Sequence, residues 1–171
     1  MKKSVKKVGI VAFAAILLSI VIVIIMAQFE RVYKKVESYG SDAVRGMRNN
    51  NPLNLRRTGI NWKGEKKEVT DKEFEEFDSL MWGLRAGLRN MRTIMSRGHN
   101  TIGSLVSVWA PPSENQTGKY IDYVVRETGY SASQRLEFEK EIMFPIVKAM
   151  CKMESNLTLN EELYEEAWAN I

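Results

Sequence analysis

The longest apolar stretch of the chain lies near its N-terminus. From Val8 to Ala27 every residue is apolar or small, and four lysines precede this run. A helix of this length spans about 30 Å, the thickness of the hydrocarbon core of a bilayer. The pattern predicts a cytoplasmic basic tail over residues 1–7 and a transmembrane helix over residues 8–27.

A cleaved signal peptide is the alternative interpretation of the apolar run. The apolar part of a signal peptide usually has about 7 to 15 residues and ends at a small-x-small cleavage site. Here the run is longer and ends in Ile25-Met26-Ala27, which is a poor cleavage site. The lysines before the run have no equally dense basic counterpart after it, so we expect a single-pass membrane protein with residues 28–171 outside the cytoplasm.

Beyond the anchor, the spacing of apolar residues predicts a mainly helical domain. Leu80, Leu84, Leu88, Met91 and Met95 form one stripe at helical spacing, and the small residues between them leave room for another helix to approach. Further helices are expected at 101–109, 113–129, 131–153 and 158–168. Three of these would open with capping boxes, at Ser113/Gln116, Ser131/Gln134 and Thr158/Glu161, and Pro145 would kink the longest.

Two segments before these helices do not follow a helical pattern. Residues 48–55 are rich in asparagine and contain a proline, which predicts an ordered turn. Residues 59–77 place scattered apolar residues around a polar Lys-Gly-Glu-Lys-Lys centre, which predicts a short, irregular β-hairpin. The expected fold class is therefore mainly α, an α+β domain with a small hairpin, preceded by one transmembrane helix.

Charge and composition exclude several function classes. The net charge of +4 comes entirely from the N-terminal lysines, because residues 28–171 hold 21 basic and 21 acidic residues. A balanced domain lacks the overall basic character of a DNA-binding domain, so we expect no nucleic-acid partner. One cysteine excludes an intramolecular disulfide, and one cysteine with one histidine leaves no zinc cluster. We expect neither a metal nor a cofactor, and the pattern does not fix an oligomeric state.

Several motifs follow one another in a fixed order. They are R-G-M-R-N-N-N-P-L-N-L-R-R from Arg45, N-W-K-G from Asn61, F-E-E-F from Phe74, G-L-R-A-G from Gly83 and V-W-A-P-P-S-E-N from Val108. In this order they resemble a family of phage and prophage virion-associated proteins with a lysozyme-like domain. The resemblance covers about residues 45–130. A fainter resemblance runs to the N-acetylglucosaminidases of bacterial autolysins and flagellar assembly, with Glu37-Ser38 at the position of their catalytic glutamate.

These resemblances imply binding, and hydrolysis, of the β-1,4-linked glycan strands of peptidoglycan by a muramidase-type or N-acetylglucosaminidase-type site. Glu37 would be the general acid, and a second carboxylate or a positioned water would stabilise the oxocarbenium ion. The candidates for the second carboxylate are Glu65 and Asp71, with Glu68 and Glu73 as unranked neighbours. Whether such a site would retain or invert stays open. Sugar-binding side chains are expected at Asn50, Asn51, Trp62, Trp109, Asn115 and Tyr120.

Each of these residues also has a structural interpretation. Glu37 belongs equally well to a solvated helix beside the membrane, the two tryptophans to the core, and the two asparagines at 50 and 51 to the turn. The leading hypothesis is a membrane-anchored lysozyme-like domain, held by the lipid bilayer through residues 8–27 in a cell or a phage particle, that acts on peptidoglycan. The alternatives are a non-catalytic phage or envelope structural protein that retains the fold, and a protein whose residues 80–171 only bind a partner.

Overall fold

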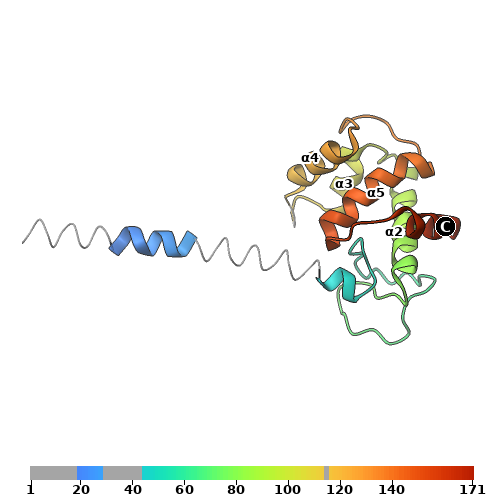
Figure 1. Ribbon diagram of the computed structural model, residues 1–171, viewed down its shortest axis with the longest axis horizontal. Coiled ribbons are helices and arrows are strands. Elements are labelled where there is room, and N and C mark those ends of the chain that lie inside the picture. Colours follow the sequence, from blue (N-terminus) through green and yellow to red (C-terminus); the bar gives the residue numbers. More distant parts are fainter. Residues whose placement is uncertain (1–18, 29–43, 114–115) are drawn as a thin grey trace, which may run out of the picture. The chain divides into compact units, whose positions relative to one another are not determined.

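The computed structural model describes residues 19–28, 44–113 and 116–171. The chain divides into two units, Met1–Ser41 and Asp42–Ile171. In the first unit, residues 19–28 are helical and their side chains are exposed. The second unit holds the described helices from α2 onward (Figure 1).

The prediction of a transmembrane helix over residues 8–27, and with it of a single-pass membrane protein, is contradicted. Among the residues that the structure describes, no helix combines the length and the apolarity needed to cross a membrane. The rest of the predicted span, residues 8–18, and the tail at residues 1–7 lie outside the described residues.

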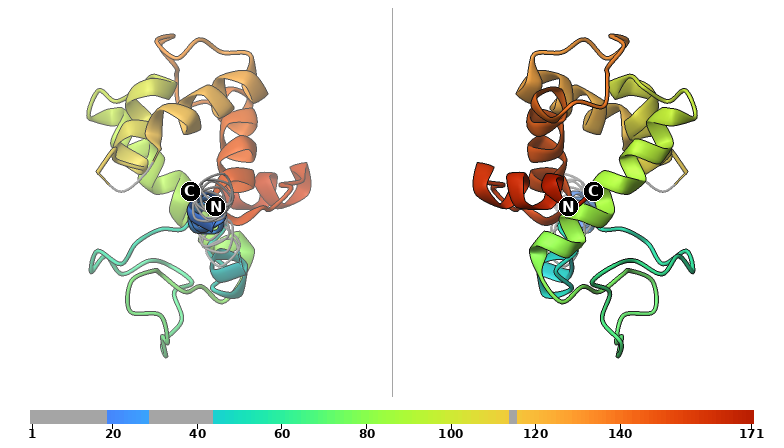
Figure 2. Two further views of the ribbon diagram at one scale, coloured as in Figure 1. Left: turned by 90° about the vertical axis from the view of Figure 1, so that its left-hand side faces the viewer. Right: turned by 90° about the vertical axis from the view of Figure 1, so that its right-hand side faces the viewer.

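The prediction of a mainly helical domain is confirmed. After a short helical segment at residues 44–48, the second unit contains α2 (Leu80–Ser96), α3 (Ile102–Trp109), α4 (Thr117–Thr128), α5 (Lys140–Ser155) and α6 (Glu161–Ala169). Helix α2 packs against α6 and α3, while α4 packs against α5 and α3. The loops between residues 49 and 79 gather at one end of α2, and α3 and α4 lie towards its other end (Figure 2).

Helix α2 has the buried stripe that its sequence predicts. Ser79 caps its N-terminus by accepting a hydrogen bond from the backbone N–H of Trp82. Its buried side contains Leu84, Leu88, Met91 and Met95. The main core joins this side to residues of the other helices, including Ile102, Leu105, Val124, Met143, Ile146, Met150 and Tyr164.

The small residues of α2 accommodate a loop and not the expected second helix. A Cβ atom on Gly83 would collide with the carbonyl oxygen of Asn50, and one on Gly87 would collide with the Leu53 side chain. Leu53 is fully buried there. The asparagine-rich turn therefore packs directly on α2, and the two glycines are needed for the close approach.

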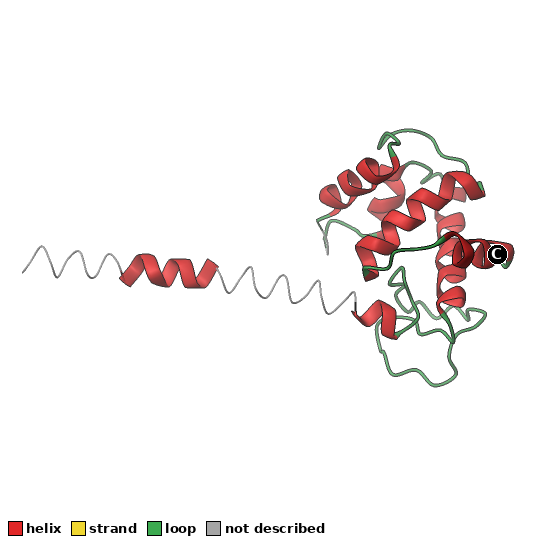
Figure 3. Cartoon of the chain, in the orientation of Figure 1, coloured by secondary structure: helices red, strands yellow, loops and turns green. Residues whose placement is uncertain are grey.

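The predicted β-hairpin is wrong. The described residues contain no strand (Figure 3), and the segment from 55 to 78 has only two isolated bridges, Arg56 with Phe74 and Glu65 with Phe77. Scattered backbone hydrogen bonds, such as that from the N–H of Arg57 to the carbonyl oxygen of Glu73 at 2.8 Å, hold the segment together without a ladder. Side chains add to them: the Asn51 amide donates to the carbonyl oxygens of Leu55 and Glu75 at 2.9 and 3.0 Å. With its backbone groups satisfied in this way, the segment needs no regular strand pairing.

The predicted capping boxes at the three later helices are also wrong. Helix α4 starts after Gln116 without a side-chain cap, and residues 131–139 form a turn and an irregular stretch before α5. Helix α6 is capped by Asn160, which accepts from the backbone N–H of Leu163. A complete capping box is found instead between Thr101 and Ser104 at α3. Here serine takes the position that the usual signature gives to Glu or Gln.

Candidate functional site

Two predicted site residues cannot be placed. Glu37 and Asn115 lie outside the described residues. The other predicted residues are distributed between the loops at residues 49–78 and the helices α3 and α4.

Asp71 is held as the centre of a buried hydrogen-bond network. The Arg45 guanidinium donates to both of its carboxylate oxygens, at 2.6 and 2.7 Å, and the Asn49 amide donates at 2.8 Å. The backbone N–H groups of Glu73 and Phe74 donate to the same carboxylate at 3.0 and 3.1 Å. The Arg45 hydrogen bonds hold the pKa of Asp71 well below its usual range. Asp71 is therefore a permanent anion whose oxygens are engaged within the fold.

Glu65 and Glu75 share the guanidinium of Arg57. Its Nη2 lies 3.4 Å from a Glu65 oxygen and its Nη1 lies 3.5 Å from a Glu75 oxygen. Glu65 is half-buried and also accepts from the backbone N–H of Trp62 at 3.3 Å. Burial, followed by the negative charge of Glu65, raises the pKa of Glu75. Glu75 was not predicted as a site residue, because the F-E-E-F motif from Phe74 gives no signal of which side chains are buried.

The two predicted asparagines build the turn. Asn50 has a positive φ of 52° and donates to the carbonyl oxygen of Phe77 at 2.9 Å. Asn51 is fully buried, and its side chain both donates to backbone carbonyls and accepts from the backbone N–H of Leu55. Both residues therefore make the contacts expected of residues that build the turn. Hydrogen bonds within the fold engage both the nitrogen and the oxygen of the Asn51 amide.

Trp62 and Trp109 are brought together with a third tryptophan that was not predicted. The tryptophan cluster, Trp62, Trp82 and Trp109, consists of half-buried residues packed against a small core of Leu55, Phe77 and Ala86.

Three features of the residues in and around the tryptophan cluster bear on its chemistry. Gly64 has a positive φ, and a Cβ atom there would collide with the Trp82 ring, so the turn after Trp62 needs glycine. The Lys63 ammonium lies 4.8 Å from the centre of that ring. The indole N–H of Trp62 has no hydrogen-bond partner among the described residues. Trp82 carried no separate signal in the sequence, because its position on α2 also fits an ordinary core residue.

Tyr120 belongs to the main core and not to the tryptophan cluster. It is buried on α4, and its hydroxyl donates to a Glu154 carboxylate oxygen at 3.0 Å. The Asn54 amide lies 3.3 Å from the other oxygen of that carboxylate. Burial, with the charge of Glu154, raises the pKa of the Tyr120 hydroxyl, which therefore stays protonated. Its role in the structure is to tie α4 to the end of α5.

The chain matches no protein-family model. Protein P5 of Pseudoalteromonas phage PM2 is 38% identical to it over 131 residues, which cover 74% of this chain and 79% of that protein. The chain belongs to the family of this phage protein. The match supports the phage part of the expectation and does not test the lysozyme-like part, which stays a prediction.

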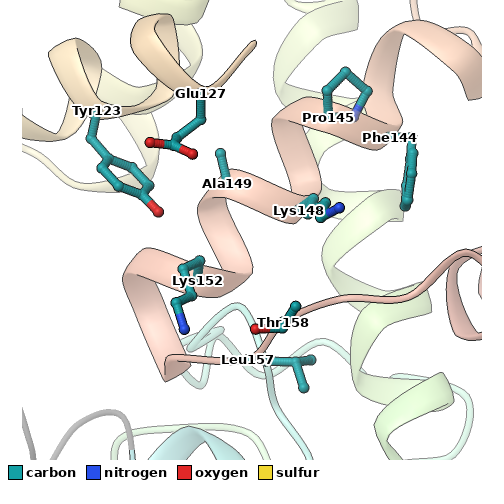
Figure 4. Close-up of a pocket in the computed structure, with 9 residues that line it drawn as sticks. All are labelled: Tyr123, Glu127, Phe144, Pro145, Lys148, Ala149, Lys152, Leu157 and Thr158. Carbon is teal, nitrogen blue, oxygen red and sulfur yellow. The ribbon is translucent and has the colours of Figure 1, made fainter.

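This member of the P5 family also has a surface hollow away from the predicted residues. The hollow, of about 420 Å³, lies between α4, α5 and the segment that follows α5 (Figure 4). Its lining combines apolar groups such as Phe144 and Leu157 with the charged groups of Glu127, Lys148 and Lys152. None of the predicted site residues that the structure describes lines it.

The described part of the P5-family chain offers no metal site. No group of three or more His, Cys, Asp or Glu side chains there could hold a metal ion. The single cysteine, Cys151, is fully buried in α5, and burial raises the pKa of its thiol. A buried thiol that stays protonated is a poor nucleophile, so Cys151 acts as a small core residue.

Proposed function

We propose that the chain is a non-catalytic component of a phage particle, in which the unit from Asp42 to Ile171 has a structural role. Its membership of the P5 family of phage PM2 supports the phage assignment. The observation that carries the non-catalytic part is the bidentate Arg45–Asp71 pair. This pair engages both oxygens of Asp71, a predicted catalytic carboxylate, in hydrogen bonds within the fold.

Glycoside hydrolysis makes demands that these carboxylates do not meet. A hydrolase needs one carboxyl group that keeps its proton and a second carboxylate that faces the sugar. Asp71 has both oxygens engaged by buried donors and a lowered pKa. Glu65 is engaged by Arg57 and by the backbone of Trp62. These contacts support a structural use for both groups.

A second candidate function is binding of peptidoglycan glycan strands without cleavage. The tryptophan cluster favours it, because indole rings are the side chains that most readily stack on the apolar faces of sugars. Sedimentation of the full chain with purified peptidoglycan, compared with Trp62→Ala, tests this candidate directly.

The particle assignment is tested by finding where the chain is located after phage release. Particles from cells that carry the gene are purified on a density gradient, and the chain is quantified by mass spectrometry in each fraction. We expect it to travel with the particles in a fixed ratio to the most abundant capsid protein. A chain found only in the particle-free fractions would contradict the proposal.

A further inference from the structure

The outer side of α2 carries a line of arginines. Arg85, Arg89 and Arg92 follow one another at intervals of four and three residues, which places them on one side of a helix. We call these three residues the arginine stripe. Arg89 and Arg92 are exposed, and Arg85 is half-buried. Arg97, also exposed, continues the positive charge at the C-cap.

Among the described residues, no carboxylate pairs with this stripe. From Ser79 to Ser113 the sequence contains four arginines and neither Asp nor Glu. In the part of the chain that the structure describes, the side chains of Arg89, Arg92 and Arg97 form no hydrogen bond or ion pair. Burial, followed by the positive charge of Arg89, lowers the pKa of Arg85. The positive charges of Arg85, Arg89 and Arg92 are therefore close together without a paired carboxylate among the described residues.

The acidic helix α6 does not compensate for the stripe, although it packs against α2. Among the described residues, the stripe is linked to this end of the chain by the hydrogen bond from Arg85 to the backbone carbonyl of Asn170, at 2.8 Å. Glu165 of α6 pairs instead with Lys140, at 2.9 Å. The balanced charge of the domain is thus separated in space, which a count of residues does not reveal.

The geometry points to the phosphate backbone of double-stranded DNA as the partner of the arginine stripe. The distance along α2 from Arg85 to Arg92 is about 10 Å, which corresponds to about three phosphates on one DNA strand. Guanidinium groups bind phosphate oxygens in a bidentate manner. A line of such groups on a straight helix matches a linear polyanion, and contacts to phosphates alone give binding without sequence preference.

The same helix argues against a lipid surface. A helix that binds a membrane exposes large apolar side chains beside its basic residues. All of α2 is described, and none of its large apolar side chains is among the exposed ones. Its apolar side is already used in the core. Only the charged side is left for a partner, which favours a polyanion in solution.

The test uses the full chain and a fluorescent double-stranded DNA of arbitrary sequence, with binding followed by anisotropy. The stripe variant is Arg89→Gln/Arg92→Gln. The matched control is Arg126→Gln/Arg135→Gln, which removes the same charge from exposed arginines paired with Glu127 and Glu137. The N-terminal lysines are present in every protein, so their contribution to binding cancels in the comparison.

We expect the stripe variant to bind DNA at least about tenfold more weakly at about 0.1 M salt. Each lost phosphate contact should reduce the slope of log K against log salt concentration by about 0.9. Its salt slope between about 50 and 200 mM should fall by about two, and the control should stay within about twofold of the parent. Absence of DNA binding, or equal loss in both variants, overturns the proposal. Binding to phosphatidylglycerol vesicles that depends on the stripe, without such binding to DNA, overturns it in favour of lipid.

Discussion

Arg45 and Asp71 form a bidentate ion pair between the helical segment at residues 44–48 and the loop before α2. The two hydrogen bonds measure 2.6 and 2.7 Å, and the Asp71 side chain is 2% exposed. The pair spans 26 residues of sequence. Since Asn49 and two backbone N–H groups complete the shell of Asp71, this carboxylate organises a loop region that contains no regular strand.

The first prediction concerns the stability that this pair provides. Asp71→Asn should lower the free energy of unfolding by about 3 kcal/mol, because it removes a buried charged acceptor and leaves Arg45 with the exposed carboxylate of Glu73 as its ionic partner. Urea unfolding followed by circular dichroism measures the change. Glu73→Gln is the matched control: Glu73 also contacts Arg45, at 3.1 Å, but its side chain is 61% exposed, so we expect less than about 0.5 kcal/mol. Equal effects of the two substitutions would contradict the assignment.

The second prediction concerns the loss of stability in acid. The pKa of Asp71 is lower in the folded chain than the ordinary value of 3.8. The folded state therefore binds the proton less well, and the contribution of Asp71 is complete above that value and is lost as the pH falls below it. The stability difference between the parent and Asp71→Asn should be constant from pH 7 to about pH 5 and shrink below about pH 4. A difference that is independent of pH would argue against this origin.

Two adjacent buried glutamates should respond in opposite directions. Burial raises the pKa of Glu75, so its charged form costs stability at neutral pH and Glu75→Gln should stabilise the fold there. That gain should disappear as the pH falls towards the ordinary glutamate value of 4.5. Burial acts to raise the pKa of Glu76 as well, but the hydrogen bonds that it accepts from the backbone N–H of Asp71 and from Thr70 outweigh burial and lower this pKa. Glu76→Gln should therefore destabilise the fold at neutral pH. Urea midpoints at pH 7 and pH 4 test both directions, and a shift of the same sign in the two variants would refute the account.

A fourth prediction concerns the contact between the turn and α2. Gly83→Ala should destabilise the fold by about 1 to 3 kcal/mol, because the new methyl group would collide with the carbonyl oxygen of Asn50. Gly118→Ala on α4 is the control, since nothing lies within 4 Å of its would-be Cβ atom. It should leave stability unchanged or raise it by up to about 1 kcal/mol. Thermal unfolding of both variants distinguishes a packing effect from a general helix propensity effect.

The helices could be predicted from the sequence where burial follows a regular period. The stripe from Leu84 to Met95 identified α2, and Gly129 marked the end of α4 with a positive φ of 73°. Helix starts were less predictable, because a side chain caps a helix only if the preceding backbone turns towards it. Ser131 has the right spacing and lies in an isolated turn, whereas Asn160 caps α6.

The conformation of the loops at residues 49–78 could be predicted less well than the helices, for a physical reason. Its order depends on long-range hydrogen bonds, such as those of Asn51 to Glu75 and of Arg45 to Asp71, and these leave no periodic pattern. The tryptophan cluster was predicted in part, since Trp62 and Trp109 were named and Trp82 was not. Tyr120 was assigned to the same group, but its hydroxyl bonds to Glu154 in the main core. The arginine stripe was hidden by the balanced total charge.

The most direct test of the central claim is release of soluble fragments from purified peptidoglycan by the full chain. Glu37→Gln is assayed beside it, with a known muramidase as the positive control. The non-catalytic account predicts no release by either form of the chain while both remain folded. Release by the parent that falls at least about a hundredfold in Glu37→Gln, the usual contribution of a general acid, would contradict the account and establish a glycoside hydrolase.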